Sequence, residues 1–491
     1  MQIMNANSNS TNMNERIFMR IVNLCNWFWY FMLTLAVVLL ATVLIRLELY
    51  AHSRVALVVY LGAPVLLFAV AVGMLKLVSP LQRLNVSLLA ASVVFSAFLI
   101  EIYLGFYGHV DLRSIKALAS GVQVDSKTRK EVIEKLRNEG RQAYLTIHPR
   151  PLLQRNPGGN EWHSILSIEG QEVLPLGGIA SVDTVYNRES GQWVVYRSDE
   201  YGFRNPSGTW SHDDFDLVVI GDSFAHGAGL MDGEDVVSLL RNDFPHTVNL
   251  GNGGNGPLMV FATLREYGQK LKPHFVVYLY FEGNDLRDLD KEKDSPLLMR
   301  YLLDPSWSQN LYEHHKAVNT ILLDFGEKQV RKYYVENPLD RLRQILALSN
   351  LRGRIGLNFT AKRKLRNLQP DLVLLEDILQ RTREEVQTWG GTFVVAYLPA
   401  WKRYKNPDNY HMYRSNVLNI LKNNKIPVVD LYPVFQKQND VFSLFHFGLD
   451  GHYNKIGARL VAEEVRKGLN EVYRETEISQ RPVSRNKKEA A

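Results

Sequence analysis

The sequence predicts an α/β protein that follows three N-terminal transmembrane helices. Three apolar runs without a charged residue lie within the first 107 residues, at 27–45, 55–75 and 84–100. Farther along, short apolar runs alternate with helical patterns, which indicates a parallel sheet covered on both faces. A stretch of about 90 residues with helical patterning interrupts this alternation after residue 281. We therefore expect a helical insertion in the α/β domain.

Each N-terminal run is long enough to cross a hydrocarbon core of about 30 Å. Charged residues stand only at the ends of the runs, as Arg46, Lys76 and Glu101 do. Trp27 and Trp29 fit an aromatic belt at the membrane interface. Buried core helices are the alternative, but three such runs in succession favour insertion into a lipid bilayer.

The orientation of the spans does not follow from charge. Lys and Arg residues near the spans are equally numerous on the two sides, so the positive-inside rule does not decide. No small-residue cleavage site follows the first run, which is expected to stay as an anchor. Three spans place the two termini on opposite sides of the membrane.

Composition sets further limits. The single cysteine, Cys25, excludes an intramolecular disulfide and a cysteine metal site. The net charge of +6 is modest for 491 residues, and we expect no metal, no cofactor and no nucleic-acid partner. The predicted organisation is a disordered polar tail at 1–26, spans at 27–107, a connecting helix and linker at 108–164, the α/β domain at 165–475 with its insertion at 286–370, and a charged tail at 476–491.

The helices and strands follow from hydrophobic spacing. Val132, Ile133 and Leu136 recur at helical spacing, and Gly140 is placed to end that connecting helix. In the α/β domain the expected strands are 215–220, 246–250, 274–281, 392–398 and 426–431. The expected helices are 234–242, 259–271, 372–388, 410–423 and 456–469.

A basic segment lies inside the insertion. Residues 341–367 contain eight Lys or Arg and no acid. Nucleic acid is a weak candidate because aromatic stacking residues are almost absent there. Anionic lipid headgroups suit a membrane-anchored protein better. An anionic glycan and a solvated helical face are the other interpretations, and the sequence does not choose.

Four short motifs follow predicted strands or precede the last helix. They are Gly-Asp-Ser at 221–223, Gly-Asn-Gly-Gly-Asn-Gly at 251–256, Glu-Gly-Asn-Asp at 282–285 and Asp-Gly-His at 450–452. Ligands of open α/β sheets bind at the carboxyl ends of the strands, where most of these motifs lie. Any one alone is weak, because Gly and Asn are common in turns and Ser often caps a helix.

Together and in this order, the motifs resemble the SGNH hydrolase superfamily, also called the GDSL esterases and lipases. The resemblance covers roughly 185–470 apart from the insertion, and it does not cover the spans. It implies a flavodoxin-like three-layer α/β/α domain. It also implies Ser223 as the nucleophile, Gly254 and Asn284 as oxyanion donors, His452 as the base and Asp450 as its partner.

The last motif departs from the family pattern. The usual spacing between Asp and His is three, whereas Asp450 and His452 are two apart, as in a variant found in polysaccharide-modifying members. His446 is a nearby alternative for a polar role. Asp222, Asn255 and Asp285 are expected to face the substrate. His226 is expected either to face the substrate or to be structural.

These residue types fit acyl transfer. A Ser hydroxyl needs an adjacent base to act as a nucleophile. His supplies this base because its pKa lies near the working pH, and a carboxylate holds the imidazole in the productive tautomer. The oxyanion needs fixed donors, which the amides of Ser223 and Gly254 and the side chain of Asn284 would supply. Gly254 would let its amide approach the substrate without a Cβ. The absence of a G-x-S-x-G elbow disfavours the α/β-hydrolase fold.

The sequence favours an ester hydrolase that removes acyl groups from a cell-envelope or exported glycan, or from a lipid-linked one. An O-acyltransferase is the second hypothesis, with a membrane protein as a possible acyl donor. A non-catalytic glycan-binding scaffold is the third, and the joint presence of the four motifs argues against it. The resemblance and the three spans imply a multi-pass protein of the inner (plasma) membrane with a periplasmic, extracytoplasmic domain.

Overall fold

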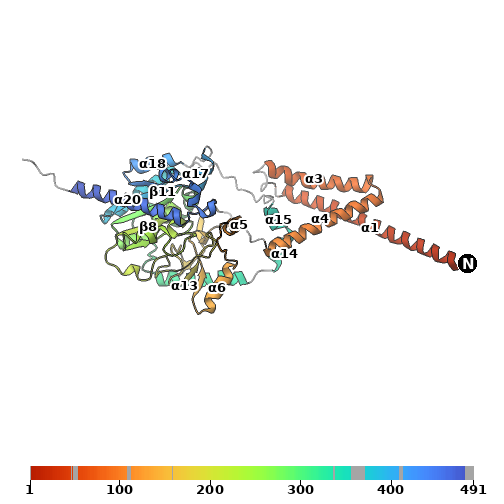
Figure 1. Cartoon of the computed structure of the whole chain (residues 1–491), viewed down its shortest axis with the longest axis horizontal. Coiled ribbons are helices and arrows are strands. Elements are labelled where there is room, and N and C mark those ends of the chain that lie inside the picture. The colour runs from red at the N-terminus through yellow and green to blue at the C-terminus, as the bar shows by residue number, and fades with distance from the viewer. Residues whose placement is uncertain are drawn as a thin grey trace, which may run out of the picture. The chain divides into compact units, whose positions relative to one another are not determined.

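The computed structural model describes residues 2–45, 47, 54–107, 112–156, 159–334, 338–354, 371–407 and 413–480 (Figure 1). The chain divides into two compact units. We call Met1–Asp111 with Glu336–Asn367 the membrane unit, and Leu112–Val335 with Leu368–Ala491 the α/β unit.

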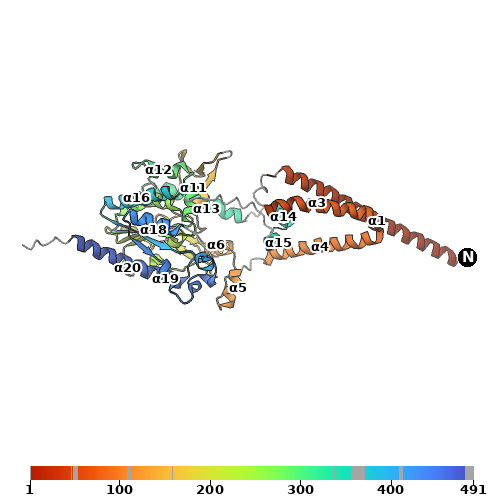
Figure 2. The same cartoon turned by 90° about the horizontal axis from the view of Figure 1, so that it is seen from above.

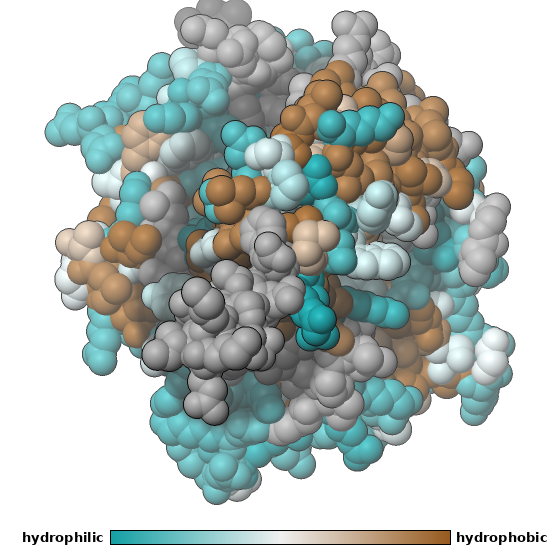
Figure 3. Space-filling model, turned by 90° about the vertical axis from the view of Figure 1, so that its right-hand side faces the viewer, coloured by the Kyte–Doolittle hydropathy of each residue, from teal (hydrophilic) through white to brown (hydrophobic). Residues whose placement is uncertain are grey.

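Three long helices form most of the membrane unit: α1 (Gln2–Ile45), α3 (Arg54–Leu77) and α4 (Pro80–Tyr107). Their segments Met19–Ile45, Leu57–Leu77 and Pro80–Gly105 are long and apolar enough to cross a membrane. Large apolar side chains such as Leu66 and Phe95 are exposed on them, and Figure 3 shows apolar surface in brown. The indole of Trp29 donates a 2.9 Å hydrogen bond to Ser87 and joins α1 to α4.

The polar N-terminal tail differs from expectation. Its described residues continue α1 without a break instead of being disordered. Once the apolar part has nucleated a helix, each added residue gains one hydrogen bond for one residue fixed, so extension is far more favourable than nucleation. The residues of the charged C-terminal tail divide similarly: 476–480 belong to a helix, and 481–491 lie outside the described residues.

Part of the basic segment folds against the third span. The helices α14 (Pro338–Leu346) and α15 (Ser349–Arg354) pack on α4 within the membrane unit. The buried carboxylate of Glu101 accepts hydrogen bonds from the amides of Asn350 at 2.9 Å and Leu351 at 2.8 Å, and from the Asn350 side chain at 3.0 Å. These bonds satisfy free N–H groups at the start of α15 and compensate the burial of the acid. Residues 355–370 of the insertion lie outside the described residues.

The α/β unit is built on a five-stranded parallel sheet. Its strands are β8 (Leu217–Gly221), β9 (Thr247–Asn249), β10 (Phe275–Phe281), β11 (Thr392–Leu398) and β12 (Val428–Asp430). Their spatial order is β12-β11-β10-β8-β9, and all four pairings are parallel. By order in the chain this is 2-1-3-4-5, the flavodoxin-like order. The predicted parallel sheet is confirmed.

Helices cover both faces of this sheet. Leu217 and Val219 pack with α8 (Val236–Leu240) and α20 (Lys455–Gln480), whereas Val218 and Ile220 pack with α9 (Pro257–Thr263), α16 (Leu372–Thr388) and α18 (Arg414–Asn423). The alternation follows from the two-residue period of a strand. Figure 2 shows α16 and α20 on opposite sides of the sheet. The insertion contributes α11 (Asp285–Glu292), α12 (Pro296–Leu303) and α13 (His315–Tyr334) to this unit.

A smaller sheet precedes the main one. It has the order β1-β6-β7, formed by β1 (Ala143–Leu145), β6 (Asp183–Val185) and β7 (Val195–Arg197). Two hairpins, β2 (Leu153–Arg155) with β3 (Trp162–Ser164) and β4 (Ser167–Ile168) with β5 (Gln171–Glu172), lie between these strands in the chain. The predicted connecting helix is α6 (Arg129–Asn138), and a further helix, α5 (Leu112–Ala119), begins the unit.

Candidate active site

The turn after β8 presents Ser223 at the carboxyl edge of the main sheet. Gly221 has a φ of +152°, and a Cβ there would lie 3.0 Å from the carbonyl oxygen of Leu279. Asp222 caps the short helix α7 (Ser223–His226) by accepting a 2.9 Å hydrogen bond from the amide of Phe224. Ser223 is therefore the first residue of a helix that starts directly at the strand end.

His452 lies between Ser223 and a carboxylate. Its Nε2 is 2.7 Å from the Ser223 Oγ, and its Nδ1 is 2.5 Å from an Oε2 of Glu189. Because a carboxylate only accepts hydrogen bonds, it places the ring proton on Nδ1. Nε2 is then free to accept the Ser223 proton, which is the arrangement of a serine–histidine–carboxylate triad.

The prediction that Asp450 orients His452 is wrong. The Asp450 carboxylate is half exposed and pairs with Lys402 at 3.2 Å. Gly451 has a φ of +153°, and a Cβ at this position would overlap Glu189. The backbone bend at this glycine leaves the place beside His452 to Glu189, while the Asp450 side chain goes to the surface.

Glu189 comes from the loop between β6 and β7, outside the four motifs. Its side chain is 7% exposed and also accepts from the amide of His452 at 3.0 Å and from Arg113 at 2.7 Å. Burial alone would raise the pKa of Glu189, but the hydrogen bond from His452 and the charges of His452 and Arg113 outweigh it, and the pKa falls to about 2. The group is thus an anion at neutral pH. Only its tertiary contact distinguishes it from other loop acids in the sequence.

Two of the three expected oxyanion donors are available. In the described part of the chain, the amides of Ser223 and Gly254 donate no hydrogen bond to another residue. Gly254 has a φ of +82°, which favours glycine. The Asn284 side chain instead donates to Asp222 at 3.0 Å and to Asp288 at 2.9 Å. Oxyanion donation by Asn284 would require the release of one carboxylate.

Two predicted substrate-facing acids are buried instead. Asp222 is 1% exposed and Asp285 is 0% exposed. Burial raises the pKa of Asp222 to about 6, and burial together with Asp222 raises the pKa of Asp285 well above its usual value. Asp285 accepts from the Tyr278 hydroxyl at 2.7 Å. Their partners are other residues of the chain, and the prediction that they face substrate is wrong for both.

The two histidines weighed as alternatives are also buried. His226 accepts a 3.3 Å hydrogen bond from the amide of Gly253 on Nδ1, and its Nε2 lies 2.7 Å from the Tyr196 hydroxyl. Burial lowers the pKa of His226 well below its usual value, so the ring is neutral. It therefore supports the loop that carries Gly254 rather than facing the substrate. Burial lowers the pKa of His446 to about 4.

Asn255 remains as the fourth predicted substrate-facing residue. It is 0% exposed, and neither atom of its side-chain amide has a hydrogen-bond partner among the described residues. It directly follows Gly254 in the glycine-rich motif. Because it is buried, the prediction that Asn255 faces the substrate is wrong.

Arg204 and Asn205, in the segment before β8, hold the backbone around the site in place. Arg204 is 6% exposed and donates to the carbonyls of Gly227 and Leu230, both at 2.9 Å. Asn205 exchanges hydrogen bonds with the backbone of Asn249, at 2.7 and 2.9 Å. This segment thus ties the helix of the nucleophile to the strand that leads into the glycine-rich motif.

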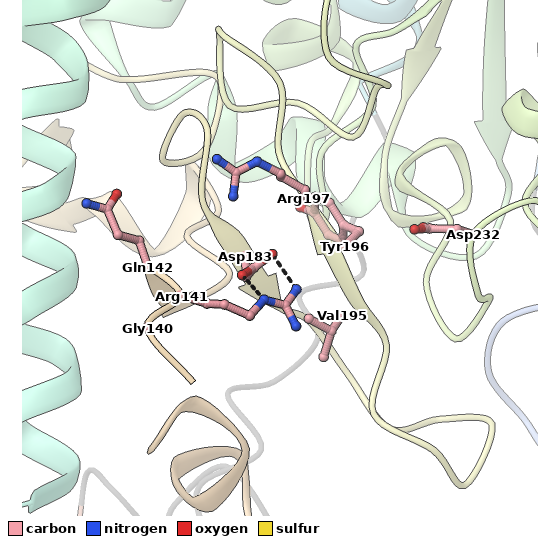
Figure 4. A pocket seen from close by; sticks show the side chains of 8 residues that line it. All are labelled: Gly140, Arg141, Gln142, Asp183, Val195, Tyr196, Arg197 and Asp232. Carbon is pink, nitrogen blue, oxygen red and sulfur yellow. Dashed lines mark hydrogen bonds and ion pairs between the residues drawn. The ribbon is translucent and has the colours of Figure 1, made fainter. Parts of the chain in front are cut away.

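A cavity of about 610 Å³ lies at the smaller sheet, and none of the three triad residues lines it. Figure 4 shows the ion pair of Arg141 and Asp183 in its wall. The lining residues are Gly140, Arg141, Gln142, Asp183, Val195, Tyr196, Arg197 and Asp232. Among the described residues, no group of three His, Cys, Asp or Glu side chains is arranged to hold a metal ion.

No protein-family model and no curated protein matches the chain. Solved structures do. The esterase EstA from Pseudoalteromonas sp. is 13% identical with a TM-score of 0.28, covering 53% of this chain and 100% of its own. The acetyl xylan esterase AlAXEase is 12% identical with a TM-score of 0.29, covering 52% and 99%. A putative lipolytic protein of the G-D-S-L family from Desulfitobacterium hafniense is 14% identical with a TM-score of 0.29, covering 52% and 99%.

At these identities and TM-scores, the similarity supports no conclusion about activity, which has to come from the residues themselves. The chain resembles the SGNH hydrolases in its four motifs, in the flavodoxin-like strand order and in the contact of Ser223 with His452 at the carboxyl edge of the sheet.

Proposed function

We propose that this protein is a membrane-anchored serine ester hydrolase that removes acyl groups, acetyl above all, from a cell-envelope or exported glycan. The observation that carries the proposal is the continuous contact from Ser223 through His452 to Glu189, at 2.7 and 2.5 Å. A serine that only capped a helix would need neither partner.

The reaction has two steps. His452 takes the Ser223 proton as Oγ attacks the ester carbonyl, and the amides of Ser223 and Gly254 donate to the oxyanion. His452 then gives the proton to the departing sugar oxygen, which leaves as a hydroxyl, and an acyl-Ser223 ester remains. A water molecule loses a proton to His452 and attacks this ester; His452 then returns that proton to the departing Ser223 Oγ, which releases the carboxylic acid and restores the serine. Glu189 balances the positive charge that His452 carries between these transfers.

The substrate class rests on the family resemblance. The last motif has the two-residue spacing from Asp450 to His452 of polysaccharide-modifying members of the superfamily, although Asp450 pairs with Lys402 here and does not orient His452. The membrane helices suit a substrate that is held at, or exported through, an envelope. We place the protein in the plasma membrane as a multi-pass protein with the α/β unit outside the cytoplasm.

The test uses the full chain in detergent micelles, with Ser223→Ala as the matched control. We expect wild type to hydrolyse p-nitrophenyl acetate, to release acetate from an acetylated xylan and to be labelled at Ser223 by a fluorophosphonate. Absence of both label and turnover in folded wild type would refute the proposal and leave a binding role. Acetyl transfer to an added sugar acceptor in excess of release to water would instead identify an O-acyltransferase.

Orientation is tested separately. Alkaline phosphatase fused after residue 491 is expected to be active, because that enzyme matures only outside the cytoplasm, where its disulfides form. A fusion that is inactive while a cytoplasmic reporter at the same position works would place the α/β unit inside.

A further inference from the structure

One side chain contacts both the acid of the triad and the loop that carries its base. Arg113 lies on α5, the first helix of the α/β unit. Its Nη1 is 2.7 Å from Oε1 of Glu189, and its Nη2 donates a 2.6 Å hydrogen bond to the carbonyl of Asp450. The guanidinium therefore bridges the two segments that must meet for His452 to be oriented.

The two oxygens of Glu189 have separate partners. Oε2 accepts from the ring of His452, whereas Oε1 accepts from Arg113 and from the backbone amide of His452. With Oε1 held in this way, the carboxylate cannot rotate without losing two hydrogen bonds. A planar guanidinium with fixed donors suits such a two-point contact better than a lysine ammonium does.

The contact with Asp450 explains the glycine between it and His452. A Cβ on Gly451 would overlap both the Glu189 carboxylate and the Arg113 guanidinium. The motif Asp-Gly-His thus provides a carbonyl for Arg113, space for Glu189 and the base in three consecutive residues.

The helix that carries Arg113 is fixed on the same two loops. Ala117 is 0% exposed, and α5 packs against the turn at His446–Gly448, close before the last motif. The backbone after α5 returns to the loop of Glu189, where the amide of Asp125 donates a 2.8 Å hydrogen bond to the carbonyl of Gly191. Lys116, one turn after Arg113 on the same helix, is exposed.

We propose that Arg113 is a positioning residue for the triad, acting through Glu189 and the Asp450 carbonyl and making α5 part of the active site. This inference rests on the proposed hydrolase function. Arg113 does not touch the reacting atoms. It holds the carboxylate at the angle and in the charge state that His452 requires.

The test compares Arg113→Met and Arg113→Lys with Lys116→Met, which removes the charge of an exposed side chain one turn along the same helix. Each full-length variant is assayed in detergent for kcat and KM with p-nitrophenyl acetate across pH. We expect Arg113→Met to lower kcat at pH 7 by about 10²-fold, the cost of a misplacement of about 1 Å, with KM little changed. Lys116→Met should stay within about twofold of wild type.

The pH profile separates positioning from general support of the fold. The charge of Arg113 lowers the pKa of Glu189. The acid limb of kcat/KM reports protonation of the base, His452, and loss of a nearby cation favours the protonated imidazole, so Arg113→Met should move this limb to higher pH. Arg113→Lys keeps the charge and should restore the acid limb while recovering kcat only in part. In a Glu189→Gln background, removing Arg113 should have a much smaller effect, because the carboxylate that Arg113 positions against His452 has already been replaced.

An Arg113→Met protein with wild-type kcat and an unmoved acid limb would overturn the inference. A lower melting temperature of that variant would not rescue it, because it would show only that Arg113 supports the fold. Should that variant not fold, a wild-type kcat for Arg113→Lys would do the same. These results require that wild type is active and labelled at Ser223. They are therefore distinct from failure of the hydrolase proposal, in which wild type itself is inert.

Discussion

Replacing Glu189 by Gln keeps the shape of the side chain and removes its charge. The carboxylate accepts at both oxygens, from Arg113 and the His452 amide on one and from the His452 ring on the other. An amide offers one oxygen and one NH₂ group. Facing its oxygen to the ring would set the NH₂ against two donors, so the lower-energy choice faces the oxygen to Arg113 and the NH₂ to Nδ1.

That choice reverses the tautomer of His452. With an NH₂ donating to Nδ1, the ring proton moves to Nε2, which can no longer accept the proton of Ser223. In serine proteases the corresponding change from a carboxylate to an amide lowers kcat by about 10⁴-fold, which is about 5 kcal/mol of transition-state stabilisation. We expect a loss of similar size for Glu189→Gln.

The assay is kcat with p-nitrophenyl acetate at pH 7, with fluorophosphonate labelling of Ser223 as a second readout. Asp450→Asn is the matched control, since its carboxylate pairs with Lys402 and is half exposed. We expect this control to change kcat by less than about threefold. Activity of Glu189→Gln within tenfold of wild type, or an equal loss in Asp450→Asn, would refute the assignment of Glu189.

Further predictions follow from the same contacts. Because its pKa is depressed, Glu189 stabilises the folded state above its unfolded pKa, and this contribution disappears as pH falls towards 2. We therefore compare the free energy of unfolding in urea of wild type and Glu189→Gln. The difference between them should be smaller at pH 3 than at pH 6, and a difference that does not change with pH would contradict this prediction. Gly451→Ala should abolish labelling of Ser223, because its Cβ overlaps Glu189, and labelling at the wild-type rate contradicts the geometry. His226→Ala leaves the amide of Gly253 without its acceptor and should lower kcat by about tenfold, measured against unchanged far-UV circular dichroism. Glu101→Ala should speed trypsin cleavage in residues 341–354, whereas equal cleavage rates would show that the contact does not hold α15.

The main sheet could be predicted because its longer strands, β8, β10 and β11, are almost continuous apolar runs. The run at β11 (Thr392–Leu398) matches its prediction at both ends, and β10 (Phe275–Phe281) begins one residue late. Three of the four motifs directly follow a predicted strand, and the fourth precedes the last helix. In contrast, the direction of a side chain depends on the backbone angles around it. The φ of Gly451 sends Asp450 to Lys402 rather than to His452.

Glu189 could not be predicted, because nothing in a short polar loop distinguishes one acid from another. Its selection depends on α5, a helix that lies within the linker predicted at 108–164. Asn284 shows a related limit. Its place in the motif is clear from the sequence, but the two carboxylates that occupy its amide are set by the packing of Asp222 and Asp288.

The hydrogen bonds of Glu101 have a consequence for biosynthesis. The third span is made early, but the amide of Asn350 that Glu101 binds is 249 residues farther along the chain. At about 5–20 residues per second, a ribosome needs about 12–50 s to reach it. During that interval Glu101 lacks its three hydrogen-bond donors from Asn350 and Leu351. The strand and turn that carry the nucleophile are synthesised within the same interval. The N-terminal unit is thus finished after much of its neighbour has emerged, and a nascent chain stopped before residue 350 leaves a carboxylate without its partners.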